Sequence, residues 1–176
     1  METERLRLRP WRPDDIESIV ALFADQAVWR YPFGRGLTRE ECERFLDRLI
    51  RHREIHGFAM WAAELREETE LVGFIGLAVP DWRNEVLPAV ELGYRLHPRC
   101  WGRGLATEGA RASLRHGFDV LGLDRVIGIF MPENVASGRV MTKLGMHHCL
   151  TTRDPTHGHA LQIREITAGE WRIGAD

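Results

Sequence analysis

Hydrophobic and polar positions along the chain recur with the periods of both strands and helices. Strict alternation from Arg5 to Arg9 predicts a strand with Leu6 and Leu8 on its buried face. Apolar runs bounded by turn residues predict further strands at 58–65, 71–79, 89–96, 125–131, 146–152 and 160–167. Apolar side chains at three- and four-residue steps predict helices over 14–23, 38–56, 105–121 and 135–144.

These elements follow one another in the order β-α-α-β-β-β-α-β-α-β-β. Short polar turns join some neighbouring strands as hairpins, whereas the helix over 105–121 connects two strands as a crossover. We therefore expect an α/β (α+β) fold in which helices flank a mixed, mostly antiparallel sheet. The chain of 176 residues shows no repeat or linker, so a single domain over 1–176 is predicted.

Composition and charge argue against several classes of protein. The chain is 44% hydrophobic and 28% charged, which is ordinary for a soluble globular protein. A formal net charge of −2 argues against a general nucleic-acid binder. No apolar run reaches the roughly 18 residues of a membrane-spanning helix, and the charged N-terminus lacks the apolar core of a signal peptide. The widely spaced cysteines, Cys42, Cys100 and Cys149, suggest reduced thiols in a cytoplasmic protein.

A glycine-punctuated turn stands between the predicted strand at 89–96 and the helix that begins at Leu105. Gly102 and Gly104 allow positive φ and a close backbone approach to a ligand. The first amides of the following helix have no partner within the helix and lie at the positive end of its dipole. This arrangement suits a phosphate group, although a tight turn with no ligand would use the same glycines.

Two familiar phosphate motifs fit this turn poorly. No segment has the lysine-containing pattern of a P-loop. A dinucleotide fingerprint would need a small residue where Thr107 stands and an acidic residue at the end of the next strand, but Asp124 precedes that strand. A nucleotide-binding oxidoreductase is therefore a weak alternative.

The pattern Arg99-x-x-Gly102-x-Gly104 resembles the (Q/R)-x-x-G-x-(G/A) signature of GCN5-related N-acetyltransferases (GNAT). Other segments resemble the ribosomal-protein N-terminal acetyltransferase (RimJ/RimL-like) branch of that superfamily. These segments are Arg5–Pro10, Val72–Gly76, Glu91–Tyr94, Asn134-x-x-Ser137 and Lys143–Met146. The resemblance covers nearly the whole chain.

The resemblance implies a GNAT fold and transfer of an acetyl group from acetyl-CoA to a primary amine, without a metal ion. Turn amides would hold the pyrophosphate of the cofactor. The implied cofactor-binding positions are Leu96, Arg99, Gly102, Arg103, Gly104, Leu105, Ala106, Thr107, Asn134 and Ser137. A homodimer is a further implication of the family.

Acetyl transfer to an amine needs a group that takes the amine proton and a donor for the departing thiolate. Glu91 is the candidate base, directly or through water, although an exposed strand carboxylate would look the same in sequence. Many relatives carry a tyrosine acid at the position of Met141, which cannot donate a proton. We therefore predict that Ser137 serves the thiolate; local capping of the helix is the alternative role.

The acceptor side carries no motif. The loops 27–37 and 153–159 are expected to contribute to the acceptor site, with Trp29, Tyr31 and Tyr94 as candidate substrate residues, although aromatic side chains often serve packing alone. A protein N-terminus and a small-molecule amine both remain open as acceptors.

The histidines at 147, 148, 157 and 159 suggest a solvated hairpin more than a zinc site. A catalytically silent acyl-CoA sensor is the main alternative function, and the presence of Glu91, Asn134 and Ser137 favours an enzyme.

Overall fold

The computed structural model describes residues 1–80, 86–154 and 157–174. Parts of two predicted loops, 81–85 and 155–156, lie outside the described residues. The described strands form one sheet of seven, in the order β1-β2-β3-β4-β5-β7-β6. The strands are β1 (Leu6–Arg9), β2 (Met60–Leu65), β3 (Glu70–Ala78), β4 (Val90–Leu96), β5 (Arg125–Phe130), β6 (His147–Arg153) and β7 (Ala160–Thr167). All neighbours run antiparallel except β4 and β5, which confirms the mixed, mostly antiparallel sheet.

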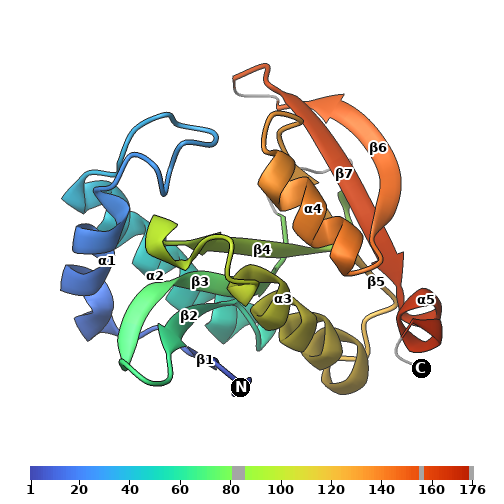
Figure 1. Cartoon of the computed structure of the whole chain (residues 1–176), viewed down its shortest axis with the longest axis horizontal. Helices are drawn as coiled ribbons and strands as arrows, with labels where there is room; N and C mark the ends of the chain where they lie inside the picture. The colour runs from blue at the N-terminus through green and yellow to red at the C-terminus, as the bar shows by residue number, and fades with distance from the viewer. Residues whose placement is uncertain (81–85, 155–156, 175–176) are drawn as a thin grey trace.

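Helices cover both faces of this sheet (Figure 1). Helices α1 (Ile16–Phe23) and α2 (Arg39–His56) pack on one face, and α3 (Leu105–Arg115) and α4 (Val135–Lys143) pack on the other. Alternation along the strands supplies both cores, because successive side chains point to opposite faces. On β3, for example, Phe74 packs with α1 and α2, whereas Ile75 packs with α3.

Two helical features differ from the sequence expectation. The crossover helix ends at Arg115 as an α-helix and continues as a π-helical turn over His116–Val120. A short helix that the apolar pattern did not predict, α5 (Ala168–Ile173), follows β7 directly. Its capping box joins Thr167 and Glu170, and Trp171 packs against Phe118 with ring centroids 5.8 Å apart. With only six residues, α5 is too short for an apolar period to identify.

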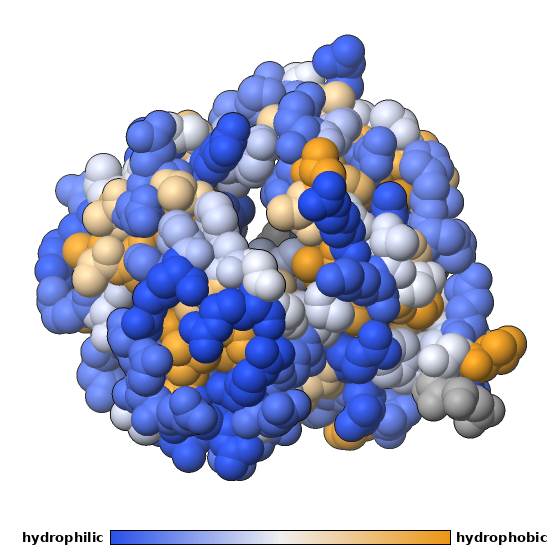
Figure 2. All heavy atoms as spheres, viewed as in Figure 1, coloured by the Kyte–Doolittle hydropathy of each residue, from blue (hydrophilic) through white to orange (hydrophobic). Residues whose placement is uncertain are grey.

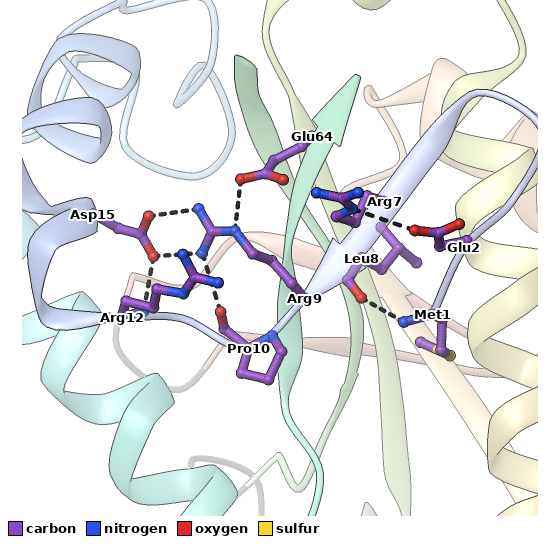
Figure 3. A network of polar contacts seen from close by, with 9 residues as sticks. All are labelled: Met1, Glu2, Arg7, Leu8, Arg9, Pro10, Arg12, Asp15 and Glu64. Carbon is purple, nitrogen blue, oxygen red and sulfur yellow. Dashed lines mark hydrogen bonds and ion pairs between the residues drawn. The ribbon is translucent and has the colours of Figure 1, made fainter. Parts of the chain in front are cut away.

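An arginine-centred network fixes the start of the chain onto the sheet (Figure 3). The Arg9 guanidinium donates to Asp15 Oδ1 at 2.6 Å and Oδ2 at 2.8 Å, and to Glu64 Oε1 at 2.6 Å. Burial raises the pKa of Asp15, but hydrogen bonds from Arg9 and from the Arg12 backbone outweigh burial and leave that pKa below its usual value. The network joins β1, the turn before α1, and β2.

Candidate active site

Strands β4 and β5 diverge soon after they meet. They are paired only at Val90–Val126 and Glu91–Ile127, whereas the other edge of β4 stays paired with β3 as far as Leu96. A cavity of about 290 Å³ lies at this divergence. Its wall includes side chains from β4, β5, α2, α4 and the loop after α1, and in the space-filling view the surface is hollowed between that loop and α4 (Figure 2).

The glycine turn closes the end of β4 and opens helix α3. Gly104 is the N-cap of α3 with φ of 81°, and Gly102 has φ of 71°. Both glycines are exposed, whereas Leu105 is fully buried and fixes the first turn of the helix in the core. The amides of Leu105, Ala106 and Thr107 belong to that first turn, whose N–H groups have no partner within the helix. The predicted phosphate site is therefore an exposed helix N-terminus held by a buried anchor.

Other cofactor positions predicted from the sequence have contacts within the protein. The Arg99 guanidinium pairs with Glu68 at 3.2 Å and with Glu70 at 2.5 Å, on the turn and strand that follow β2. The carbonyl of Leu96 accepts a hydrogen bond from Trp101 Nε1 at 2.8 Å. These contacts hold the turn in place, so a cofactor role for Arg99 and Leu96 stays a prediction.

Helix α4 begins at the far wall of the cavity. Asn134 caps it by accepting from the Ser137 amide at 3.2 Å. The Tyr94 hydroxyl lies 2.9 Å from the Ser137 carbonyl oxygen and 2.9 Å from Ser137 Oγ. Burial raises the pKa of Tyr94 to about 12, against the opposing effects of Ser137 and of the Arg164 charge.

The position of Tyr94 adds a contact that the sequence did not predict. Tyr94 is a candidate substrate residue, and its phenol contacts the serine that is predicted to serve the thiolate. The side chain lies on the α3–α4 face of β4 and packs against the core there. Strand alternation could have placed Tyr94 on that face, but no local signal could have paired it with a residue 43 positions away.

The residue at the family's tyrosine position has a packing role. Met141 is 1% exposed and belongs to the core on the α4 side of the sheet. A Cβ added at Gly128 would lie 2.5 Å from Met141 Cε, so the methionine fills the space above that glycine. A tyrosine at position 141 would overpack this region, so a Met141→Tyr variant would disturb the packing as well as add a proton donor.

The opposite face of β4 carries Glu91 and Arg95, and both residues line the cavity. The Arg95 guanidinium donates to the Val28 carbonyl and, at 2.8 Å, to the Tyr31 carbonyl. It also stacks over the Trp29 ring at 4.0 Å from the ring centre. Burial lowers the pKa of Arg95 to about 10, which still leaves it charged at neutral pH. Arg95 therefore fastens the loop after α1 to β4, a contact that sequence analysis did not predict.

The aromatic loop residues divide between packing and the cavity. Trp29 is 6% exposed and packs edge-on against Phe23 and Phe45, so it serves the core as well as the cavity wall. Tyr31 donates from its hydroxyl to the Glu133 carbonyl at 3.2 Å and thereby connects the loop to the start of α4. This segment therefore combines packing in the core with a place on the cavity wall, and its role toward an acceptor stays a prediction.

The histidines near β6 contact local polar groups. His147 pairs with Glu170 at 2.9 Å, and His157 pairs with Asp154 at 2.8 Å. Among the residues that the structure describes, no group of three His, Cys, Asp or Glu side chains could hold a metal ion.

Cys42 and Cys100 are buried free thiols, and Cys149 is an exposed one. None of the described helices is both long and apolar enough to cross a membrane.

Comparison with known proteins identifies the family. Residues 5–147 match the acetyltransferase (GNAT) domain. The chain belongs to the GNAT family and is an N-acetyltransferase. It is 32% identical over 150 residues to the uncharacterized N-acetyltransferase YoaA of Bacillus subtilis, and the match covers 82% of this chain and 81% of that protein. It is also 36% identical over 157 residues to the FsC-acetyl coenzyme A-N(2)-transacetylase of Aspergillus fumigatus, over 86% of this chain and 66% of that protein.

Solved structures of GNAT proteins share the fold. An acetyltransferase (GNAT family) from Bacillus anthracis superposes with a TM-score of 0.79 at 26% identity, over 97% of this chain and 99% of that chain. The ribosomal-protein-S5-alanine acetyltransferase from Vibrio fischeri superposes with a TM-score of 0.78 at 16% identity, over 97% of both chains. The second comparison concerns the fold alone.

Proposed function

We propose that this protein transfers an acetyl group from acetyl-CoA to a primary amine, with both substrates bound at once. The observation that supports this most is the divergence of β4 from β5 beside the N-terminus of α3. The divergence leaves part of the β4 edge without its β5 partner, next to an exposed turn suited to a pyrophosphate. A cofactor with a phosphate at one end and a thioester at the other fits such a path.

The proposed cofactor contacts follow the two helix N-termini. The amides from Gly102 to Thr107 would bind the pyrophosphate of coenzyme A through the first turn of α3. Asn134 and Ser137, on the cavity wall at α4, would lie near the sulfur end. Backbone amides of β4 near Tyr94–Leu96 would stabilise the negative charge that develops on the thioester oxygen.

The reaction would take place in the cavity where β4 and β5 diverge, which both Glu91 and Ser137 line. The amine nitrogen attacks the thioester carbonyl, a C–N bond forms, and the C–S bond breaks. Glu91 accepts the proton that the nitrogen loses, directly or through water, and the sulfur leaves as a thiolate that accepts a hydrogen bond from Ser137 Oγ. Holding both substrates together replaces a covalent enzyme intermediate.

The acceptor is proposed to be a primary amine that reaches Glu91 past the loop after α1. Relatives differ in what their names specify: the fungal one is an N(2)-transacetylase, and the structural neighbour acts on an alanine of ribosomal protein S5. A small-molecule amine and a protein N-terminus are therefore both tested as acceptors. A cytoplasmic location, with reduced cysteines, accords with this activity.

Binding and turnover separate the proposal from its alternatives. Acetyl-CoA at about 100 times its Kd should stabilise the protein by about 2.7 kcal/mol in a thermal-shift assay, whereas NAD should give no shift. Turnover on any member of a panel of amines and N-terminal peptides supports the enzyme. Binding without turnover across the panel would instead support a silent acyl-CoA sensor.

Glu91→Gln tests the proposed base in the same assay. The variant should bind acetyl-CoA normally, turn over more slowly, and lose the pH dependence that a carboxylate base produces between about pH 6 and 9. Wild-type turnover across this range would remove Glu91 from the mechanism.

A further inference from the structure

A carboxylate lies in the first turn of the helix that is proposed to bind the pyrophosphate. Glu108 Oε1 accepts from the Thr3 hydroxyl at 2.6 Å and from the Arg5 amide at 2.8 Å. Its Oε2 contacts Arg5 Nε at 2.7 Å and Arg5 Nη2 at 2.6 Å. The segment before β1 is thus fastened to α3 across about 100 positions of sequence.

Arg5 also reaches the glycine turn itself. Its Nη1 donates to the Arg103 carbonyl at 2.9 Å, and its Nη2 lies 3.6 Å from the point that a Cβ on Gly104 would occupy. In a planar trans peptide the N–H points away from the preceding C=O. Because Arg5 holds the Arg103 carbonyl on its own side, the Gly104 amide is directed to the opposite side.

The electrostatics of this contact matter for an anionic ligand. An ionised Glu108 near the N-terminus of α3 stabilises the helix but repels a pyrophosphate at the same end. Burial raises the pKa of Glu108, yet the hydrogen bonds from Thr3 and Arg5 outweigh burial and keep it below its ordinary value. The carboxylate is therefore ionised at neutral pH, and the Arg5 guanidinium offsets its charge.

We propose that Arg5 and Glu108 are positioning residues for the cofactor: Arg5 orients the Arg103–Gly104 peptide toward the pyrophosphate and neutralises the carboxylate beside it. This inference rests on the proposed function, because it concerns the same acetyl-CoA site. It goes further by giving a role in cofactor binding to a residue outside the glycine turn. The proposed role concerns the pyrophosphate, since Arg5 is not among the residues that line the cavity at β4 and α4.

The test compares two ligands on four variants by calorimetry. The ligands are acetyl-CoA and acetyl-pantetheine, which carries the same thioester and lacks the pyrophosphate. The variants are Arg5→Gln, Glu108→Gln, the double variant, and Arg7→Gln. Arg7 is a matched control because it lies on β1, is half exposed, and pairs with Glu2 away from the turn.

Arg5→Gln should weaken acetyl-CoA binding by about tenfold, because an unpaired carboxylate then faces the pyrophosphate. Acetyl-pantetheine binding should stay unchanged, and Arg7→Gln should leave both ligands unaffected. The double variant should bind acetyl-CoA more tightly than Arg5→Gln alone, since it removes the repelling charge. Added salt should reduce the difference between Arg5→Gln and the double variant.

If Arg5→Gln lost the same affinity for acetyl-CoA and for acetyl-pantetheine, Arg5 would have only a structural role and the inference would be overturned. An unchanged affinity of Arg5→Gln for acetyl-CoA would also overturn it. If Arg5→Gln unfolds, Arg5→Lys takes its place, because it keeps the charge and loses the planar fork. It should then show an acetyl-CoA-specific loss smaller than tenfold. A wild-type protein that binds no acetyl-CoA would instead refute the proposed function.

Discussion

The phenolic oxygen of Tyr94 lies 2.9 Å from both the carbonyl oxygen and Oγ of Ser137, so strand β4 and helix α4 are joined across the cavity between them. A phenol has one proton to donate. When Tyr94 donates to Ser137 Oγ, the serine keeps its own proton for the proposed thiolate; when Tyr94 donates to the Ser137 carbonyl, its oxygen can accept from the serine hydroxyl until a thiolate forms. In both arrangements Tyr94 holds Ser137 in place near the proposed thiolate site.

Ser137→Ala should lower kcat with a smaller effect on the KM for acetyl-CoA, because the lost donor would act on charge that develops in the transition state. We expect a loss below about 10²-fold, since the amides of α4 can partly replace the hydroxyl. Steady-state kinetics on the best amine provide the measurement. Tyr94→Phe is the companion variant; it keeps the serine hydroxyl and should lose less activity. An unchanged kcat in Ser137→Ala would exclude Ser137 from the reaction.

Gly104→Val should weaken acetyl-CoA binding through backbone strain. At φ of 81° a β-branched residue is strongly disfavoured, whereas the nearest protein atom to an added Cβ is Arg5 Nη2 at 3.6 Å. Gly122→Val is the matched control, because Gly122 has φ of 66°, an added Cβ there would meet no atom within 4 Å, and it lies outside the turn. Both variants should lose a similar stability of about 1–2 kcal/mol. Only Gly104→Val should lose affinity in a calorimetric titration; equal affinities would contradict the assignment of this turn.

Arg95→Gln should raise the KM for the acceptor amine and leave acetyl-CoA affinity unchanged. The substitution removes the forked contact to the Val28 and Tyr31 carbonyls and the stacking on Trp29, so the loop after α1 is no longer fixed to β4. Limited proteolysis near residue 31 should become faster at the same time. A parallel loss of acetyl-CoA affinity would indicate that Arg95 supports the whole cavity and not the acceptor side alone.

Asp15→Asn should destabilise the protein at neutral pH by about 2 kcal/mol, which is typical for hydrogen bonds to a charged group. The folded pKa of Asp15 lies below its unfolded value of about 3.9, so its stabilisation is present above that pH and is lost as pH falls through the folded pKa. The difference between wild type and variant in urea denaturation should therefore be largest near pH 7 and shrink in strong acid. A difference independent of pH would assign the effect to packing.

Local patterns were sufficient for much of the fold. The alternation of Arg5–Arg9 predicted β1, and the apolar steps over 38–56 and 135–144 predicted α2 and α4. Each of these signals operates within a few residues. The family followed from motifs of the same short range, such as Arg99-x-x-Gly102-x-Gly104.

The contacts that shape the candidate site were out of reach because they join distant segments. Tyr94 and Ser137 are 43 positions apart, and Arg95 and Tyr31 are 64 positions apart. Glu108 in the sequence is a helical carboxylate like any other, and only the fold brings it to Arg5. Side chains that carry charge can pair with many partners, so their choice depends on tertiary structure.

Helix α3 carries the proposed phosphate site and also holds the two parts of the sheet together. Between β4 and β5 the sheet is joined by two register pairs, so the four N-terminal strands and the three C-terminal strands share a narrow seam. Helix α3 packs on β1, β3 and β4 and also contacts α4, which places it across that seam. A ligand bound at the N-terminus of α3 would thus couple occupancy of the proposed cofactor site to the cooperative unfolding of the two parts of the sheet. Amide hydrogen exchange along α3 would report ligand binding and cooperative unfolding with one set of probes.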